Sequence, residues 1–377
     1  MSPLPETILQ FGSGKFLRAF ADLFIHQANE QGQNIGRVVV VQSTGSDRAS
    51  SLMAQGGRYQ VVIRGYENGE TIDRVEECAS LSRALVAGTQ WNELRRVICS
   101  PDLRFILSNT TEAGFNTDPD DRPEDTPPRS FPAKLIVLLG ARFDAGLPGL
   151  TIIPCELLEG NASLLRATVL KLAEEWRYHK AFITWLRDEC VWLHTLVDRI
   201  VAGTPMNHPL LASDPMLIMA EPFAFWALEE HPKAFPFVKH PAIKRTQDVM
   251  PYFLRKVRIL NAGHTALLIK AMPLGYRLVR EAMQDKKIVQ WLESLLFDEI
   301  VPLLAGRVEE PDRFARQTLD RFRNPFLDHK FSDIALHQYN KIKIRLQSSL
   351  DEYIQHYNRE PVLLKDVVAE GLASLKK

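Results

Sequence analysis

The chain has 377 residues, of which 45% are hydrophobic, and its formal net charge is zero. This neutral balance provides no basic field, so we expect no nucleic-acid partner. The four cysteines lack C-x-x-C spacing and indicate neither a zinc site nor a disulfide framework. No apolar run approaches the roughly 20 residues that cross a bilayer, and the amino terminus lacks a signal-peptide pattern. We therefore expect a soluble, cytoplasmic protein without a membrane segment, and the chain length predicts two domains.

The amino-terminal residues alternate between apolar runs and a glycine turn. Residues 7–11 are apolar, Gly12-Ser13-Gly14 interrupts them, and residues 15–25 resume with helical spacing. Residues 36–41 have the pattern of a buried parallel strand, which completes a β-α-β unit. In such a unit the glycines let the backbone approach a pyrophosphate. The cofactor-binding candidates are Phe11, Gly12, Ser13, Gly14, Lys15 and Phe16.

Two positions of this dinucleotide fingerprint depart from the common pattern. Leu17 occupies the third glycine position, so the match is G-x-G-x-x-L. The acidic residue expected at the end of the second strand is also absent, because residues 42–48 are Gln-Ser-Thr-Gly-Ser-Asp-Arg. Asp47 or Ser43 could contact a ribose, whereas Arg48 could contact a 2′-phosphate. We expect NAD as the cofactor, and NADP stays an open alternative.

The rest of the pattern predicts a mixed first half and a helical second half. In the first half we expect a hairpin around Asn68-Gly69, a strand from Arg104 that ends in a polar loop, an exposed proline-rich excursion over 116–132, and a strand over 149–156. Helical spacing is found over residues 162–177, 180–202, 252–271, 275–283, 286–306, 310–322 and 328–355, and one strand over 215–219. We therefore predict an α/β fold with a Rossmann-type dinucleotide-binding domain over residues 1–246 and a mostly α-helical catalytic domain over residues 247–377.

One short motif in the second half carries chemistry. Lys256, Asn261 and His264 have the spacing K-x4-N-x2-H, and on an α-helix they would fall within roughly 140° of arc. A cation, an amide and an imidazole on one face can move a proton, hold an alkoxide and orient a hydroxyl. The competing interpretation of the motif alone is a solvated, basic helix start with a core histidine.

The motif stands among other short motifs in a fixed order along the chain. These are Phe11-Gly-Ser-Gly-Lys-Phe-Leu-Arg-Ala19, Thr110-Thr-Glu-Ala-Gly114, Pro154-Cys-Glu-Leu157, Leu196-Val-Asp-Arg-Ile200 and Arg321-Phe-Arg-Asn-Pro325. Together they resemble the polyol-specific long-chain dehydrogenases, also called the mannitol dehydrogenase family. The resemblance covers residues 8 to about 350. The glycine turn of that family also lacks the third glycine.

The resemblance implies a reaction and its catalytic residues. It implies a metal-free oxidoreductase that interconverts a keto-uronate and a hexonate, with tagaturonate and altronate as the expected pair. Lys256 would be the general acid in reduction and the general base in oxidation. Asn261, together with Asn161, would form an amide cradle for the developing alkoxide. His264 would hydrogen-bond a neighbouring substrate hydroxyl.

The resemblance also implies substrate- and cofactor-binding residues, and three of them have a structural alternative. Arg321 and Asn324 would bind the substrate, since an arginine suits a carboxylate, or Arg321 would form a helix-end ion pair. His329 would line the site or pack in the core. Val197 and Asp198 would approach the nicotinamide, or Asp198 would form a buried salt bridge. Glu112 is a candidate on the cofactor side.

Two alternative functions remain open at this point. The first keeps the chemistry and changes the substrate to fructuronate and mannonate, or to a neutral polyol and ketose such as mannitol and fructose. The second is a nucleotide-binding protein without turnover. The sequence leaves the oligomeric state open.

Overall fold

The computed structural model describes residues 4–67, 69–205 and 207–375. They form two compact units. The first comprises the described residues up to Val62 together with Val75–Ala220 and Ala224–Val249. The second comprises Ile63–Arg74, Glu221–Phe223 and the described residues from Met250 onward. The predicted boundary between residues 246 and 247 stays a prediction, and the sequence pattern gave no sign that the two short segments group with the second unit.

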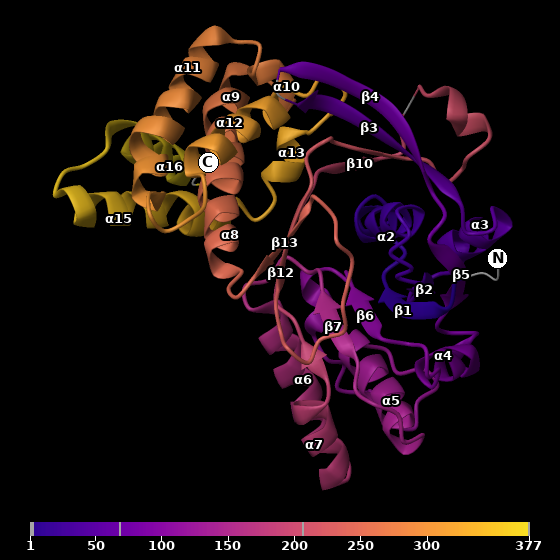
Figure 1. The fold of residues 1–377 in the computed structure, drawn as a ribbon. Helices are drawn as coiled ribbons and strands as arrows, with labels where there is room; N and C mark the ends of the chain where they lie inside the picture. The colour runs from indigo at the N-terminus through magenta and orange to yellow at the C-terminus, as the bar shows by residue number, and fades with distance from the viewer. Residues whose placement is uncertain (1–3, 68, 206, 376–377) are drawn as a thin grey trace. The chain divides into compact units, whose positions relative to one another are not determined.

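A parallel sheet is the centre of the first unit (Figure 1). Its six strands lie in the order β5-β2-β1-β6-β7-β8, and every neighbouring pair is parallel. The strands are β1 (Glu6–Phe11), β2 (Arg37–Gln42), β5 (Leu81–Val86), β6 (Phe105–Ser108), β7 (Thr151–Pro154) and β8 (Val191–Trp192). The chain runs outward from β1 in both directions, as the predicted Rossmann-type domain requires. The predicted α/β fold is confirmed.

Alternating side chains bury both faces of this sheet. On one face, Leu9, Val39 and Ile106 join the core formed with α4 (Trp91–Ile98), α5 (Phe131–Asp144), α6 (Asn161–Glu175) and α7 (Lys180–Asp188). On the other face, Phe105 contacts Phe237 with the ring centroids 4.9 Å apart. Strands buried on both faces explain the continuous apolar runs in the sequence.

The helix predicted over residues 15–25 is divided into α1 (Lys15–Arg18) and α2 (Ala21–Glu30). Phe20 separates them because its backbone is not helical, with φ −133° and ψ −95°. Its ring lies between those of Phe16 and Phe24 and contacts Trp226 at 5.2 Å. Packing of this aromatic side chain therefore coincides with the bend between the two helices.

The helix predicted over residues 180–202 is wrong beyond Asp188. After α7 the chain forms β8, β9 (Thr195–Asp198) and β10 (Val201–Gly203). The spacing of Trp185, Trp192 and Leu196 imitates a helix, but Val191, Thr195, Val197 and Val201 are β-branched and pair with distant strands. Thr195 also donates from Oγ1 to the carbonyl oxygen of Pro154 at 2.5 Å.

The other strands form two smaller sheets. One has the order β10-β11-β3-β4 and includes β3 (Tyr59–Glu67), β4 (Glu70–Cys78) and β11 (Ile218–Ala220). The adjacency of β3 and β4 confirms the predicted hairpin, although Asn68 itself lies outside the described residues. The other sheet has the order β13-β12-β9, and its strands β12 (Phe225–Glu229) and β13 (Ile243–Thr246) were not predicted.

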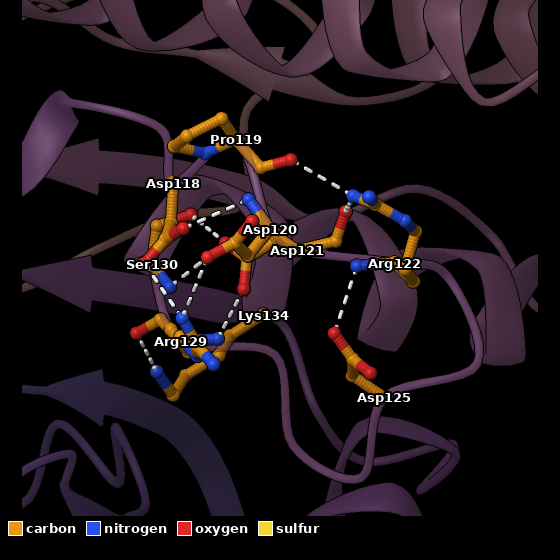
Figure 2. Close-up of polar contacts among 9 residues, drawn as sticks. All are labelled: Asp118, Pro119, Asp120, Asp121, Arg122, Asp125, Arg129, Ser130 and Lys134. Carbon is orange, nitrogen blue, oxygen red and sulfur yellow. Dashed lines mark hydrogen bonds and ion pairs between the residues drawn. The ribbon is translucent and has the colours of Figure 1, made fainter.

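The proline-rich excursion is anchored by a buried aspartate (Figure 2). Asp121 accepts hydrogen bonds from the backbone N–H groups of Arg129 and Ser130 and from the hydroxyl of Ser130. Lys134, also buried, donates from Nζ to the carbonyl oxygen of Arg129. Ser130 in turn caps α5 by accepting from the N–H of Ala133 at 3.4 Å. The loop is therefore exposed along most of its length but tied to the start of α5.

The second unit is mostly helical, as predicted. Its helices are α8 (Met250–Arg255), η3 (Lys256–Asn261), α9 (Ala262–Ala271), η4 (Met272–Leu274), α10 (Val279–Ala282), α11 (Lys286–Ser294), η5 (Leu295–Ile300), η6 (Val301–Leu304), α12 (Pro311–Phe322), α13 (Phe331–Ile334), α14 (Gln338–Ile342), η7 (Lys343–Gln347), α15 (Ser348–Tyr357) and α16 (Val362–Ser374). Two predicted helices are shorter: 275–283 is helical only over α10, and 328–355 is interrupted near His337, whose φ is 56°.

Helix α9 is central to the core of this unit. Every residue of it is buried except Lys270, which is half-buried, and the apolar ones join the main core cluster. A helix buried on all sides is fixed by its neighbours, so α9 is a rigid base for the motif at its start. Among the described residues no helix is long and apolar enough to cross a bilayer.

The first unit also contains α3 (Asp47–Ala54), η1 (Glu112–Phe115) and η2 (Pro209–Ala212). Helix α3 follows β2 directly, and η1 follows β6. Both therefore start near the carboxyl ends of parallel strands, where ligands bind in open α/β sheets.

Candidate functional site

The glycine turn follows β1 and is shaped by close backbone contacts. Gly12 has φ +127°, and a Cβ at this position would lie 2.8 Å from the carbonyl oxygen of Asn109. Its N–H donates to the carbonyl oxygen of Val41 at 3.2 Å. At Gly14, by contrast, an added Cβ would meet nothing within 4 Å. The turn is thus packed against neighbouring backbone at Gly12 and has open space beside Gly14. Such a turn can accommodate a dinucleotide phosphate.

The other predicted residues of this turn differ in exposure. Ser13 is buried and Lys15 is exposed. Phe11 packs on Phe131 with the ring centroids 5.0 Å apart, and Phe16 is half-buried against Phe20. Lys15 donates from Nζ to the carbonyl oxygen of Ala202 at 3.4 Å. Phe11 and Phe16 thus hold the turn by packing, and their contact with a cofactor stays a prediction.

The loop after β6 contains a strained residue. Thr111 has φ +77°, which is rare for a β-branched residue. A Cβ on Gly114 would lie 2.2 Å from Oγ1 of Thr110, so the loop closes tightly on itself. Such strain is often found at functional sites. The side chain of Glu112, predicted on the cofactor side, lies outside what the structure describes.

A buried carboxylate links this loop to β7. Glu156 accepts at Oε1 from the N–H and hydroxyl of Thr110, at 2.8 and 2.9 Å, and at Oε2 from the hydroxyl of Ser108 at 3.0 Å. Burial raises the pKa of Glu156, and these hydrogen bonds act in the opposite direction. Asn109 reinforces the link by donating to the carbonyl oxygen of Cys155 at 2.7 Å. The ends of β6 and β7 are therefore held at one edge of the sheet.

The side-chain amide of Asn161 forms hydrogen bonds within the first unit, and the residue is 1% exposed. Its Nδ2 donates to the carbonyl oxygens of Pro154, Glu156 and Thr195, at 3.0 to 3.2 Å. Its Oδ1 accepts from the N–H groups of Ala162 and Thr195. These contacts hold β7, β9 and α6 together, and a place in an alkoxide cradle stays a prediction.

Val197 and Asp198 lie at the end of β9, not in the helix that we predicted over residues 180–202. Both are buried, and they pair with Trp226 and Phe225 of β12. The neighbouring Arg199 donates to the carbonyl oxygen of Ala19, at the end of α1, at 2.7 Å. The strand end is thereby connected to the helix that follows the glycine turn.

The K-x4-N-x2-H motif coincides with a π-helical segment of the second unit. Lys256 and Asn261 are the first and last residues of η3, and the N–H of Ala262 donates to the carbonyl oxygen of Val257, five residues earlier. In this wider turn a residue stands over the residue five positions before it, so Lys256 and Asn261 share one face. Both are half-buried. π-Helical turns inside α-helices are frequent at functional sites.

His264 lies against His329 and Phe322. The ring of His264 is 4.7 Å from that of His329, edge to face, and 4.1 Å from that of Phe322. His264 is 7% exposed, and its Nε2 has no hydrogen-bond partner within the described protein. Nδ1 of His329 likewise has none there. Two buried ring nitrogens are thus available to a ligand with hydroxyl groups.

The surroundings of His264 keep it neutral. Burial lowers its pKa well below the ordinary value, and the charges of His329, Arg321, Arg345 and Lys256 lower it further. Burial also lowers the pKa of His329. A neutral imidazole can donate or accept one hydrogen bond at each nitrogen, according to its tautomer.

Arg321 forms a buried ion pair with Glu221. The two side chains are each 2% exposed and approach to 2.8 Å, and the guanidinium lies 4.2 Å from the ring centroid of Phe223. Asn324 is also buried, and it donates to the carbonyl oxygen of Arg64 at 3.0 Å. The alternative of an ion pair for Arg321 is therefore observed, and substrate contacts of Arg321 and Asn324 stay predictions.

Sequence reasoning missed several residues that shape these regions. Glu156 stood inside a motif that we quoted, but no role followed from it. Glu221 precedes Arg321 by 100 residues, and nothing in the sequence pairs them. The described residues include no group of three His, Cys, Asp or Glu side chains arranged to hold a metal ion.

Comparison with known protein families accounts for both units. Residues 6–239 match the mannitol dehydrogenase Rossmann domain, and residues 248–374 match the mannitol dehydrogenase C-terminal domain. The chain belongs to the mannitol dehydrogenase family. It is therefore an oxidoreductase enzyme that acts on a secondary alcohol, with a nicotinamide dinucleotide as cofactor.

Curated members of the mannitol dehydrogenase family are similar over most of the chain. An altronate oxidoreductase of Halalkalibacterium halodurans is 37% identical, across 96% of this chain and 74% of the relative. The altronate oxidoreductase of Bacillus subtilis is 36% identical, across 95% of this chain and 77% of the relative. That of Escherichia coli is 38% identical, across 92% and 75% respectively.

Two solved dehydrogenase structures share the fold. A D-sorbitol dehydrogenase in substrate-free form superposes with a TM-score of 0.85 at 23% identity, covering 99% of this chain and 81% of that one. The mannitol 2-dehydrogenase of Pseudomonas fluorescens, in a ternary complex with NAD and D-mannitol, gives 0.81 at 23% identity, with 99% and 79% covered. At this identity the likeness supports the fold alone.

Proposed function

We propose that this enzyme interconverts tagaturonate and altronate, a keto-uronate and the corresponding hexonate. Relatives named altronate oxidoreductase at 36 to 38% identity support this substrate class. The cations Lys256 and Arg345, which help to lower the pKa of His264, would favour a substrate that carries a carboxylate. The alternatives are fructuronate with mannonate, and a neutral ketose with its polyol.

The observation that carries the proposal is the pair of unpartnered histidine nitrogens. Nε2 of His264 and Nδ1 of His329 are buried, and no described protein group bonds them. Buried polar atoms normally have partners, so these two positions suit the hydroxyls of a sugar acid. Two rings 4.7 Å apart and nearly perpendicular, at 73°, would contact neighbouring hydroxyl groups. A hexonate carries such hydroxyls along its chain.

Lys256 would move the proton. In reduction its ammonium group would protonate the carbonyl oxygen of the substrate, and in oxidation its neutral amine would remove the hydroxyl proton. Asn261, on the same face of η3, would donate its amide hydrogen to the developing alkoxide. Arg321, oriented by Glu221, would bind the carboxylate of the substrate.

The cofactor would bind at the glycine turn of the first unit. The closed backbone at Gly12 and the open space at Gly14 fit its phosphates. When bound, a nicotinamide dinucleotide supplies or accepts the hydride of the reaction. We propose NAD, because Asp47 follows β2 with its carboxylate held by the Gln42 amide at 2.9 Å. An acid there suits a ribose hydroxyl and repels a 2′-phosphate.

The test is oxidation of NADH by the purified enzyme with tagaturonate, fructuronate and fructose in parallel. The proposal expects turnover with tagaturonate and a kcat/KM at least about 100-fold lower with the other two. Comparable turnover with fructose would assign the enzyme to neutral polyols. Binding of NADH without turnover on any of the three substrates would contradict the proposed reaction.

A further inference from the structure

A buried polar network stands directly behind the glycine turn. Nε2 of Gln10 donates to the carbonyl oxygen of Gly12 at 3.2 Å and to Oδ2 of Asp22 at 3.3 Å. Gln10 and Asp22 are both fully buried, on β1 and α2. Tyr59 on β3 shares its single hydroxyl hydrogen between the carbonyl oxygen of Arg18 at 2.8 Å and Oδ2 of Asp22 at 3.4 Å. One amide therefore connects the turn to a buried acid.

The acid in this network has few partners. Its Oδ2 receives two long hydrogen bonds, and its Oδ1 has no partner within the described protein. Burying an ionised carboxylate with so little compensation is unfavourable. Burial accordingly raises the pKa of Asp22 to about 7, although the bond from Gln10, the charge of Arg18 and the bond from Tyr59 oppose the shift. Asp22 thus changes charge near neutral pH.

The other groups that face Asp22 do not titrate in that range. Burial raises the pKa of the Tyr59 hydroxyl well above 10, and it raises the pKa of the Cys78 thiol on β4 to about 12. Burial likewise raises the pKa of the Cys155 thiol well above its ordinary value. Arg18, whose guanidinium lies 5.4 Å from the Tyr59 ring centroid, remains a cation near neutral pH. Between pH 6 and 8, therefore, the proton on Asp22 is the variable in this network.

We propose that Gln10 and Asp22 are positioning residues for the dinucleotide, in which the Gln10 amide fixes the Gly12 carbonyl and the Asp22 carboxyl controls that amide. The NH2 group of Gln10 has two hydrogens, one for the Gly12 carbonyl oxygen and one for Asp22, and both hydrogen bonds are long. When Asp22 ionises, its hydrogen bond from the amide strengthens, since hydrogen bonds to ionised acceptors are about twice as strong, and the amide nitrogen moves from Gly12 towards Asp22. The hydrogen bond to the turn is then weaker, and a buried negative charge lies behind the phosphate site.

The inference rests on dinucleotide binding at the glycine turn and concerns the strength of that binding. We expect NADH to bind wild type about 5-fold more weakly at pH 8 than at pH 6, the effect of about one hydrogen bond. Asp22→Asn should remove this pH dependence and keep the affinity that wild type has at pH 6. Gln10→Leu should weaken binding about 5-fold at both pH values, with kcat at saturating NADH unchanged.

The measurement is the dissociation constant of NADH by fluorescence titration, together with amide hydrogen exchange of the peptide over residues 11–16 in the absence of NADH. Exchange in that peptide should be faster in Gln10→Leu than in wild type. Asn29→Ala is the matched control. Asn29 lies on α2, the helix that also carries Asp22, but it forms its hydrogen bonds with Ile35 and Gly36 and not with the glycine turn. It should lower stability and leave the NADH affinity and the exchange unchanged.

Three outcomes would overturn the inference, and they are distinguishable. The first outcome is that Gln10→Leu binds NADH with wild-type affinity and that the NADH affinity of wild type does not change with pH. This result would remove the positioning role and leave the proposed function intact. A wild type that binds no NADH would overturn the proposed function and this inference together. A loss of affinity in Asn29→Ala equal to that in Gln10→Leu would reduce the effect to general destabilisation and also contradict the positioning role.

Discussion

The guanidinium of Arg321 and the carboxylate of Glu221 form a bidentate pair in the interior of the second unit. Nε of Arg321 lies 3.1 and 3.0 Å from the two carboxylate oxygens, and Nη2 lies 2.8 Å from Oε1. Because the guanidinium also lies over the Phe223 ring, its plane is fixed from two directions. The pair orients the arginine that we propose binds the substrate carboxylate.

Removing only the acid should therefore be costly. Glu221→Gln leaves Arg321 buried without a compensating charge, and we expect the free energy of unfolding to fall by about 3–5 kcal/mol. The double variant Glu221→Leu with Arg321→Met should recover most of that stability, since both charges are gone. If Arg321 binds substrate, the double variant will still show a much higher KM for tagaturonate. Recovery of both stability and KM would assign Arg321 a structural role alone.

His264 should make the protein sensitive to acid. Its folded pKa lies below the unfolded value of about 6.5, so the unfolded chain binds more protons and stability falls as the pH drops below that value. His264→Asn should lose less stability than wild type between pH 7 and pH 5 in urea unfolding. The same variant should lower kcat/KM at pH 7 by about tenfold or more, through loss of a hydrogen bond to the substrate. An unchanged kcat/KM would place His264 outside the site.

Asp121 should stabilise the proline-rich loop. Burial alone would raise its pKa, but the hydrogen bonds from Ser130 and the N–H of Arg129 outweigh this and the net shift is downward. Its contribution is therefore present above the unfolded pKa and is lost as the pH falls through the folded one. Asp121→Ala should cost about 2–3 kcal/mol at pH 7, because three donors lose their acceptor. Asp120 is exposed, and Asp120→Ala should change the free energy of unfolding by no more than about 0.5 kcal/mol. An equal loss of stability in both variants would show that Asp121 does not anchor the loop.

Asp47 should determine the choice of cofactor. The Gln42 amide fixes its exposed carboxylate and lowers its pKa, so the acid is ionised at neutral pH. We expect the ratio of kcat/KM with NADH to that with NADPH to fall by about tenfold or more in Asp47→Ser. Asp102→Ser, an exposed acid that precedes β6 at the amino ends of the strands, should leave the ratio unchanged. A preference for NADPH in wild type would contradict the assignment of NAD.

The sequence predicted those parts whose signals are local. The run from β1 through the glycine turn to β2 was recognised, because buried parallel strands are continuously apolar and a glycine turn interrupts them. The motif from Lys256 to His264 was recognised from its spacing, but its π-helical turn was not, since that geometry depends on packing around η3. Spacing also led to a wrong prediction, because the tryptophans of α7 and β8 lie at helical spacing and suggested one helix over residues 180–202.

The parts that escaped prediction depend on distant partners. Glu221 is buried only because Arg321 lies opposite it, and Asp22 is unusual only because β1 and β3 enclose it. The predicted roles of Asn161 and Arg321 came from motif position, which says nothing about the hydrogen bonds that each side chain makes inside the fold. Those contacts are tertiary, and no local pattern encodes them.

The proposed reaction requires Lys256 to transfer the proton in a keto-uronate reductase, and replacing this lysine is the sharpest test of it. Lys256→Met keeps the length of the side chain and removes its amine. We expect NADH to bind this variant with wild-type affinity while tagaturonate-dependent oxidation of NADH falls by about 10³-fold or more. Lys270→Met, which removes a lysine paired with Glu370 on α16, should retain full activity. Turnover in Lys256→Met close to that of wild type would contradict the account.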